Sequence, residues 1–403
     1  MSITCCFDRG REKLTNGSPS HEIRGTAGPV ASESRLDERT RAVLPTTSKL
    51  APLPLGPIEE NPLVSVLVTS YNYARYLPAA LKSVSQQTYR NLQAIVCDDG
   101  SSDDSVAVIK RHAESDARFQ VICKENGGQS SALNAAYARA QGSIICLLDS
   151  DDEFCPRKIE AVVSAFRERP NAGLCIHKIL PVSRRGWTLE TPYPITLDDG
   201  WVAQKGLRRG GRCEAPPTLG ISLRKEIAEQ LFPIPERFRW SPDASLVMRA
   251  QFLTEIVAIP EVLAKHRLHG GNLSISLRPE VVTVRRSLED IRQFFEETKA
   301  FVADRWGQET AAAIRLEDCE LYWLTLLALY VVEGSGNGKV QGYPVEQVLA
   351  NLPESKRKRL WEQLLRLPPS LAQGGLALWM GAYPGKGLIR WLAMRLTGWL
   401  GIR

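Results

Sequence analysis

The stretch that decides the fold is VSVLVTSYNYARYLPAALKSVSQQTYRNLQAIVCDDGSSDDS, residues 64–105. Two short apolar segments, 63–69 and 92–98, read as strands, and the segment 78–86 between them reads as a helix. Both strands are apolar on both faces, which is typical of parallel strands covered by helices. The stretch therefore predicts a β-α-β unit, followed by a second helix over 103–114.

The same alternation continues along the chain. Further strands are expected at 119–124, 143–149 and 174–180, with helices at 129–140 and 156–167. The fold class predicted is α/β, with a mostly parallel, Rossmann-like sheet flanked by helices. In open sheets of this kind a ligand binds beyond the carboxyl ends of the strands, at a switch point of the topology.

Composition divides the 403 residues into three parts. Residues 1–60 are rich in Ser, Pro, Gly and charge without periodicity, which predicts a disordered leader. Residues 61–275 carry the β-α alternation, and residues 276–403 are largely helical, which predicts a helical C-terminal extension. The apolar run 321–332 is too short to cross a bilayer and indicates a buried helix.

Charge and cysteine content exclude several classes of protein. A net charge of +6, with 45 acidic residues among the basic ones, does not favour a nucleic-acid partner. The start MSITCCFDRGREK is charged where a signal peptide needs an apolar segment. No CxxC pair occurs among nine cysteines, and those in or beside strand-like runs indicate buried thiols in a reducing compartment: Cys97, Cys123, Cys146 and Cys175. A cytoplasmic location is therefore expected.

Polar side chains follow four of the predicted strands, at the point where each strand ends. They are Thr69 and Tyr71, then Asp98 and Asp99, then Asn126 with Gly127 and Gly128, and finally Asp149 with Asp151. Because the carboxyl ends of parallel strands meet at one edge of a sheet, we expect these groups to converge there.

The last of these sites is the most acidic. The segment LLDSDDEF, 147–154, places Asp149, Asp151, Asp152 and Glu153 within five positions, where like charges repel. Asp-x-Asp at a strand end suits Mg²⁺ or Mn²⁺, which take oxygen ligands and leave positions open for phosphates. For Asp152 and Glu153 an alternative is that they begin the following helix, where its dipole favours negative charge.

The motifs together resemble a known family. Residues 64–105, the segment ENGGQSSALNAAYARAQGSIICLLDSDDEF (125–154), and the later PDASLVMRA and RLHGGNLS are similar to the GT-A-fold glycosyltransferases of family 2. That family transfers a sugar from a nucleotide diphosphate with inversion. The resemblance covers residues 62–275.

The resemblance implies a role for each matching residue. The nucleotide sugar would be bound by Thr69, Tyr71, Asp99, Asn126, Gly128, Asp149 and Ser150. Asp99 would accept a hydrogen bond from the base, most often uracil, since cytosine offers no such N–H. Asp149 and Asp151 match the Asp-x-Asp pair that contacts ribose and a divalent cation, Mn²⁺ or Mg²⁺, and His269 is a further candidate ligand of that cation.

The resemblance also implies a catalytic base. Asp243, just before a predicted helix, matches the aspartate that takes the acceptor proton. The family usually has an acid before this aspartate, where this chain has Pro242. The alternative is that Asp243 caps the helix, although Ser241 could do so instead. The DDGSSDD loop, likewise, fits a turn with a helix cap as well as a base pocket.

The implied function is transfer from a nucleotide sugar, expected to be a UDP-sugar, to a hydroxyl of a glycan or lipid-linked acceptor in cell-surface polysaccharide or glycolipid synthesis. A sugar-phosphate nucleotidyltransferase is one alternative, although no Gly-rich basic loop follows the first strand. A silent nucleotide-sugar-binding protein is another, although the acids are intact. The end GKGLIRWLAMRLTGWLGIR, 385–403, fits an interfacial helix on the inner membrane face and equally a core-packing helix.

Overall fold

The computed structural model describes residues 49–189, 191–239, 241–269, 272, 280–334 and 338–380, with side chains up to Leu376 at the C-terminal end. The terminal segment 385–403 and most of the predicted leader lie outside the described residues. All statements below concern the described part of the chain.

The β-α alternation predicted over residues 64–168 is present, with ends within a few residues of the expected ones. The strands are β1 Val64–Ser70, β2 Leu92–Asp98, β3 Phe119–Cys123, β4 Ile144–Asp149, β5 Glu153–Phe154, β6 Ala172–Ser183, β7 Ile221–Arg224, β8 Glu255–Leu268, β9 Lys339–Val340 and β10 Tyr343–Pro344. The helices are α1 Leu77–Ser85, α2 Ser105–Ser115, α3 Gln129–Tyr137, α4 Lys158–Glu168, α5 Ala203–Leu207, α6 Lys225–Leu231, α7 Pro242–Ala250, α8 Val281–Ala312, α9 Glu320–Glu333, α10 Val345–Ala350, α11 Lys356–Leu365 and α12 Pro369–Met380.

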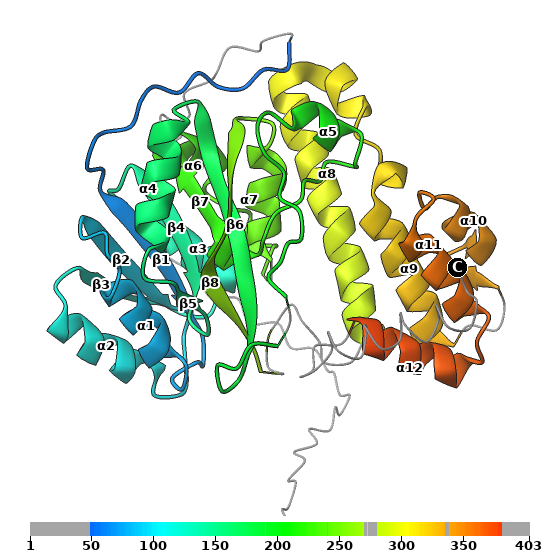
Figure 1. Ribbon diagram of the computed structural model, residues 1–403, viewed down its shortest axis with the longest axis horizontal. Coiled ribbons are helices and arrows are strands. Elements are labelled where there is room, and N and C mark those ends of the chain that lie inside the picture. The colour runs from blue at the N-terminus through cyan, green and yellow to red at the C-terminus, as the bar shows by residue number, and fades with distance from the viewer. Residues whose placement is uncertain are drawn as a thin grey trace, which may run out of the picture. The chain divides into compact units, whose positions relative to one another are not determined.

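The main sheet has eight strands in the order β3-β2-β1-β4-β7-β6-β8-β5 (Figure 1). The first four are parallel to one another, and β6 is parallel to β8. Among the described strands of this sheet only β7 and β5 pair antiparallel, β7 with β4 and β6, and β5 with β8. The prediction of a mostly parallel sheet flanked by helices, followed by a helical C-terminal region, is confirmed. The sequence did not predict β5, β7 or β8.

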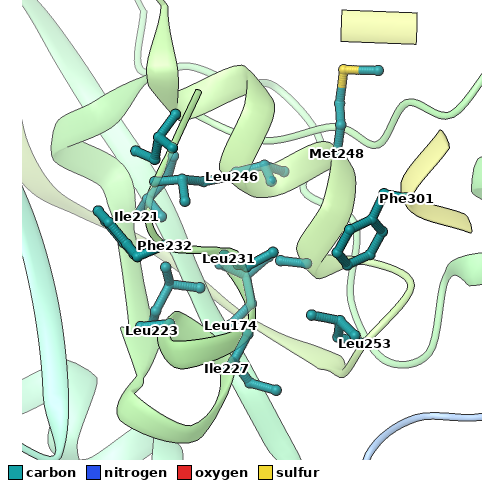
Figure 2. Packing of buried hydrophobic residues seen from close by; sticks show 14 of the residues in the cluster. Leu174, Ile221, Leu223, Ile227, Leu231, Phe232, Leu246, Met248, Leu253 and Phe301 are labelled. Carbon is teal, nitrogen blue, oxygen red and sulfur yellow. The ribbon is translucent and has the colours of Figure 1, made fainter. Parts of the chain in front are cut away.

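Two apolar layers cover the sheet, because successive residues of a strand point to opposite faces. On β1, Val66 and Val68 pack with α1, α2 and α4, whereas Leu67 faces the cluster built with α3, α6 and α7. Figure 2 shows part of the second cluster, in which Leu246 and Met248 of α7 lie above Leu223 of β7. Burial on both faces explains why these strands are apolar throughout.

Helix α8 belongs to two cores. Phe294, Phe301 and Trp306 join the cluster that covers the sheet, whereas Val284, Leu288 and Ile291 pack with α9 to α12. Gly307, with φ of +84°, interrupts the helix near its end. The described helices from α8 onward are therefore packed on the sheet through α8. The apolar run at 321–332 forms α9, and no described helix is both long and apolar enough to cross a membrane.

The folded part begins earlier than residue 61. Leu50, Leu53 and Leu55 pack on the cluster over the sheet, and the N–H of Leu53 donates to the carbonyl of Leu253 at 2.7 Å. The predicted leader therefore does not extend to residue 60, because a few spaced leucines in a Pro-rich segment are enough to dock an extended chain.

Candidate active site

One cavity of about 280 Å³ opens beyond the carboxyl ends of β1, β2 and β4. It is lined by all the predicted nucleotide-sugar residues and by two other predicted ones: Thr69, Tyr71, Asp99, Asn126, Gly128, Asp149, Ser150, Asp151 and Asp243. Of the predicted site residues only His269 is not among the lining residues. The expected convergence of strand ends therefore occurs, and it includes a residue from α7, far along the chain.

Gly128, the second glycine of the pair after the third strand, lines the cavity. Gly128 precedes the first residue of α3 and has a φ of +90°, which disfavours a side chain. A Cβ there would also lie 3.2 Å from Arg239 Cβ. The backbone of this loop therefore comes close to the space that the ligand would occupy, at the positive end of a helix.

Asp99 is held by this loop. One carboxylate oxygen accepts from Lys124 Nζ at 2.7 Å and from the N–H of Gly127 at 3.0 Å, and the other accepts from the N–H of Gly128 at 2.7 Å. A carboxylate can accept about four hydrogen bonds. Asp99 thus has capacity left for a base N–H, and it also fixes the glycine loop. Neighbouring Asp98 binds Ser101 through both oxygens and supports the turn.

The acidic segment lies directly across from β1. Asp149 Oδ1 accepts from Thr69 Oγ1 at 3.1 Å and from Gln129 Nε2 at 2.6 Å. Burial, and then the charges of Asp151 and Asp243, raise the pKa of Asp149 to about 7. Burial likewise raises the pKa of Asp152 well above its ordinary value, with Asp151 adding to the effect. These acids are therefore crowded at a cost that a positive ligand would remove.

The alternative for Asp152 and Glu153 is wrong, because neither begins a helix. Glu153 lies in β5 and helix α4 starts only at Lys158. Asp152 Oδ1 accepts the N–H of Arg267 at 2.8 Å, and the Arg267 guanidinium pairs with Glu153. Both acids thus fasten the acidic segment to β8, because a strand pairing across the sheet replaces the helix that local sequence favours.

His269 lies beside the acidic segment. Its Nε2 is 3.0 Å from Asp151 Oδ2, and its ring stacks on Tyr76 with 4.6 Å between centroids. Asn272 Nδ2 reaches the same oxygen of Asp151 at 3.3 Å. His269 therefore contacts a predicted cation ligand rather than the cavity. Among the described residues no group of three or more His, Cys, Asp and Glu side chains is arranged to hold a metal ion.

The carboxylates of the cavity nevertheless fit a divalent cation whose coordination is completed by phosphate oxygens of a ligand. Mg²⁺ and Mn²⁺ sites of this type use one or two carboxylates, with the substrate diphosphate supplying further oxygens. Asp149 and Asp151 would supply the carboxylates, and burial, followed by the charges of Asp151 and Asp243, raises the pKa of Asp149. In the same wall the hydroxyls of Ser70 and Ser150 are buried without a hydrogen-bond partner among the described residues, which indicates that a polar ligand is expected there.

Asp243 lies within the first turn of α7, one residue after its first residue Pro242, rather than ahead of the helix as the sequence suggested. Its Oδ2 accepts the N–H of Thr218 at 3.1 Å. Burial raises its pKa, and the amides of Ala244 and Thr218 partly oppose this. Ser241 occupies the cap position but makes no side-chain cap hydrogen bond, while Asp243 accepts from the Ala244 amide and lines the cavity, so its cavity position and a part in capping are compatible.

Several lining residues were not predicted from sequence: Tyr73, Gln129, Thr218, Arg239, His266 and Asn272. Gln129 directly follows the glycine pair in a quoted motif, so its position beside Asp149 could have been expected. Thr218 stands in APPTLG, which has no charge or periodicity to mark it. It is brought to Asp243 by the antiparallel strand β7, which the sequence did not reveal.

Comparison with known proteins assigns the chain to a family. Residues 65–218 match the family described as Glycosyl transferase family 2. An uncharacterized glycosyltransferase of Nostoc sp. is 34% identical over 218 residues, which cover 53% of this chain and 67% of that protein. The chain belongs to glycosyltransferase family 2. The resemblance on which the site residues were chosen is therefore confirmed, while their individual roles remain predictions.

A further relative matches a shorter part of this glycosyltransferase, and two solved structures align with a longer part of it at low sequence identity. Chondroitin synthase of Pasteurella multocida is 37% identical over 118 residues, 29% of this chain and 12% of that protein. The crystal structure of S. aureus TarS in complex with UDP aligns over 78% of this chain and 89% of the TarS chain, with a TM-score of 0.44 and 15% identity. Mannosyltransferase PcManGT from Pyrobaculum calidifontis, in complex with GDP-Man and Mn²⁺, has a TM-score of 0.41 and 19% identity.

Proposed function

We propose that this chain is an inverting, cation-dependent glycosyltransferase that moves a sugar from a UDP-sugar to a hydroxyl acceptor, a glycan or a lipid-linked saccharide. One observation carries the proposal: a single cavity joins the two carboxylates suited to a diphosphate-bound cation, Asp149 and Asp151, with a separate carboxylate, Asp243. Family membership favours this reaction over nucleotidyl transfer.

Donor binding would use the strand ends. The base would stack on the exposed Tyr71 ring and donate its N–H to Asp99, which selects uracil over cytosine. The diphosphate would lie between the acidic segment and the start of α3. A divalent cation held by Asp149 and Asp151 would neutralise the diphosphate charge.

The transfer step needs one base. Asp243 takes the proton of the acceptor hydroxyl while that oxygen bonds to the anomeric carbon. The bond from the anomeric carbon to the diphosphate oxygen breaks at the same time, and its electron pair leaves with UDP. Because one displacement occurs, the configuration inverts. Burial keeps the pKa of Asp243 above that of an ordinary carboxylate, which makes it a better proton acceptor.

The test separates chemistry from binding. Hydrolysis and binding of UDP-glucose, UDP-N-acetylglucosamine, UDP-glucuronic acid and GDP-mannose are measured with Mn²⁺, and the preferred donor is retained. Asp243→Asn keeps size and hydrogen bonding but removes basicity, so turnover should fall about 10²–10⁴-fold. Donor affinity should stay near the wild-type value. Donor binding without any turnover in the wild type would instead favour a silent nucleotide-sugar-binding protein.

A further inference from the structure

A lysine lies buried behind the wall of the cavity. Lys158, the first residue of α4, has a side chain with 0% exposure to solvent. Its Nζ donates to the carbonyl of Leu219 at 2.9 Å and lies 3.5 Å from the centre of the Phe154 ring. An ammonium group in an apolar layer is uncommon, because its transfer out of water is costly.

Among the described residues no acidic side chain pairs with this ammonium group. The titratable groups that surround Lys158 are Cys146 of β4, Cys155, and Cys175 and His177 of β6. Burial lowers the pKa of Lys158 to about 8, so the ammonium form still prevails at neutral pH. A methionine or leucine would fill the same space without the desolvation cost. The feature that such a residue could not supply is the hydrogen bond to Leu219.

The acceptor of that hydrogen bond belongs to a turn that lines the cavity. Leu219 lies in the single turn Thr218–Gly220, and both Thr218 and Leu219 line the cavity. The N–H of Thr218 donates to Asp243 Oδ2 at 3.1 Å. The turn therefore accepts a hydrogen bond from Lys158 through the Leu219 carbonyl and donates one to Asp243 through the Thr218 N–H.

The second contact of Lys158 is with the Phe154 ring of strand β5. Phe154 directly follows Glu153 in β5, the strand that fastens the acidic segment to β8. A cation over an aromatic ring is attracted to it, more strongly when both are shielded from water. Strand β5 is also held to β8 by its own pairing and by Arg267, so the turn Thr218–Gly220 is the part of the cavity that depends on Lys158.

We propose that Lys158 is a positioning residue for glycosyl transfer: its ammonium group fixes the turn Thr218–Gly220, and the N–H of Thr218 in turn orients the carboxylate of Asp243. This inference rests on the proposed function, in which Asp243 is the base. It predicts a defect in the chemical step, with donor binding left intact.

The experiment is a double-mutant cycle on hydrolysis of the preferred donor with Mn²⁺. Lys158→Met should lower kcat about tenfold while KM and the donor Kd change less than twofold, since a small displacement of a catalytic group costs rate. In the Asp243→Asn background the same change should have almost no further effect on kcat, because residues that act through one another are not additive. Val162→Ala, in the same buried face of α4, serves as the control for lost stability.

Four outcomes of this experiment would contradict the positioning role or the proposed function. A Lys158→Met effect of equal size in both backgrounds, or one that raises KM as much as it lowers kcat, overturns the positioning role. If Val162→Ala lowers kcat equally, the effect is one of packing and the proposal fails. If Asp243→Asn alone keeps wild-type turnover, the proposed function fails, which is a separate result.

A second variant covers failure to fold. Lys158→Gln keeps a polar side chain, but it is one bond shorter and uncharged, and it should therefore show a smaller fall in kcat at unchanged KM. A folded Lys158→Gln protein with wild-type kcat also overturns the proposal. Circular dichroism of each purified variant establishes folding before any rate is compared.

Discussion

Gln129 Nε2 donates to Asp149 Oδ1 at 2.6 Å and so links the start of α3 to the end of β4. The amide neutralises part of the negative field at a carboxylate whose pKa is already raised. Because α3 also begins at the glycine loop that Asp99 holds, Gln129 fixes the position of Asp149 relative to Asp99 in the proposed nucleotide site.

Gln129→Leu should therefore weaken UDP binding. The substitution leaves Asp149 with one donor fewer, at a cost of about 1–3 kcal/mol for an unmet buried group. We expect a loss of UDP affinity of about tenfold, measured by titration calorimetry with Mn²⁺. Gln120→Leu, on the exposed side of β3, is the matched control and should leave affinity unchanged. Equal affinity of Gln129→Leu and wild type would contradict the role.

Removal of the cation should affect UDP more than uridine. Without the cation, the negative charges of Asp149 and Asp151 would face those of the diphosphate. Breaking such a charge pairing costs about 3 kcal/mol or more. Calorimetry should show UDP affinity lost on addition of EDTA and restored by Mn²⁺, with uridine affinity insensitive to both. Asp151→Asn should reduce the difference between the two conditions. UDP affinity that is the same with EDTA would show that no cation bridges the diphosphate.

In the proposed function Asp99 both recognises the base and holds the glycine loop, and two variants separate these roles. Asp99→Ala removes the base acceptor and also loosens Gly127 and Gly128, so both UDP affinity and discrimination against CDP should fall. Lys124→Met removes only the ammonium group that contacts Asp99 at 2.7 Å. The affinities for UDP and CDP should then change together, so that the ratio of their dissociation constants is kept. The ratio of the two dissociation constants is the measurement. A wild-type ratio in Asp99→Ala would mean that another residue recognises the base.

Much of the site was predictable because it lies on a repeated local pattern. The parallel strands are apolar on both faces, so their ends, and the polar residues Thr69, Asp99 and Asp149 that follow them, can be located from sequence. The acids at residues 149–153 predict a cation site because like charges this close together repel one another.

The rest depends on contacts between distant segments. The strand β7 has only four residues, Ile221–Arg224, and the turn before it reaches Asp243 only because β7 pairs antiparallel with β4 and β6. Nothing in its composition marks either the pairing or the N–H of Thr218. Arg267 and Lys158 likewise act through partners more than 60 positions away. Such partners are set by sheet order, which local propensity does not determine.

The rate should depend on pH through Asp243. A base acts only when deprotonated, and burial raises the pKa of Asp243 above the ordinary value for an aspartate. The kcat for donor hydrolysis should therefore fall tenfold per pH unit below that raised pKa and level off above it. A pH–rate profile with saturating donor and Mn²⁺ is the measurement. A profile flat down to the pKa of a free aspartate would contradict the assignment.

The stability of the cation-free protein should show the cost of the acidic cluster. The pKa of Asp149 is about 7 in the folded chain and about 4 when unfolded. Between those values the folded state binds more protons than the unfolded state, so the free energy of unfolding falls as pH rises through this window. Asp149→Asn removes that titration. Its melting temperature should match the wild type near pH 4 and exceed it near pH 8, by an amount equivalent to a few kcal/mol, on the order of 1.4 per pKa unit.

Added Mn²⁺ with UDP should reverse this order. The ligands bind the ionised form of Asp149 and stabilise the folded state by mass action, whereas the amide of Asp149→Asn cannot bind the cation with the same charge. At pH 8 the wild type should then melt above the variant. Thermal scans at pH 4 and pH 8, with EDTA or with Mn²⁺ and UDP, provide the four comparisons. A variant that is less stable than wild type in EDTA at pH 8 would show that Asp149 contributes more through its hydrogen bonds to Thr69 and Gln129 than it costs through its charge.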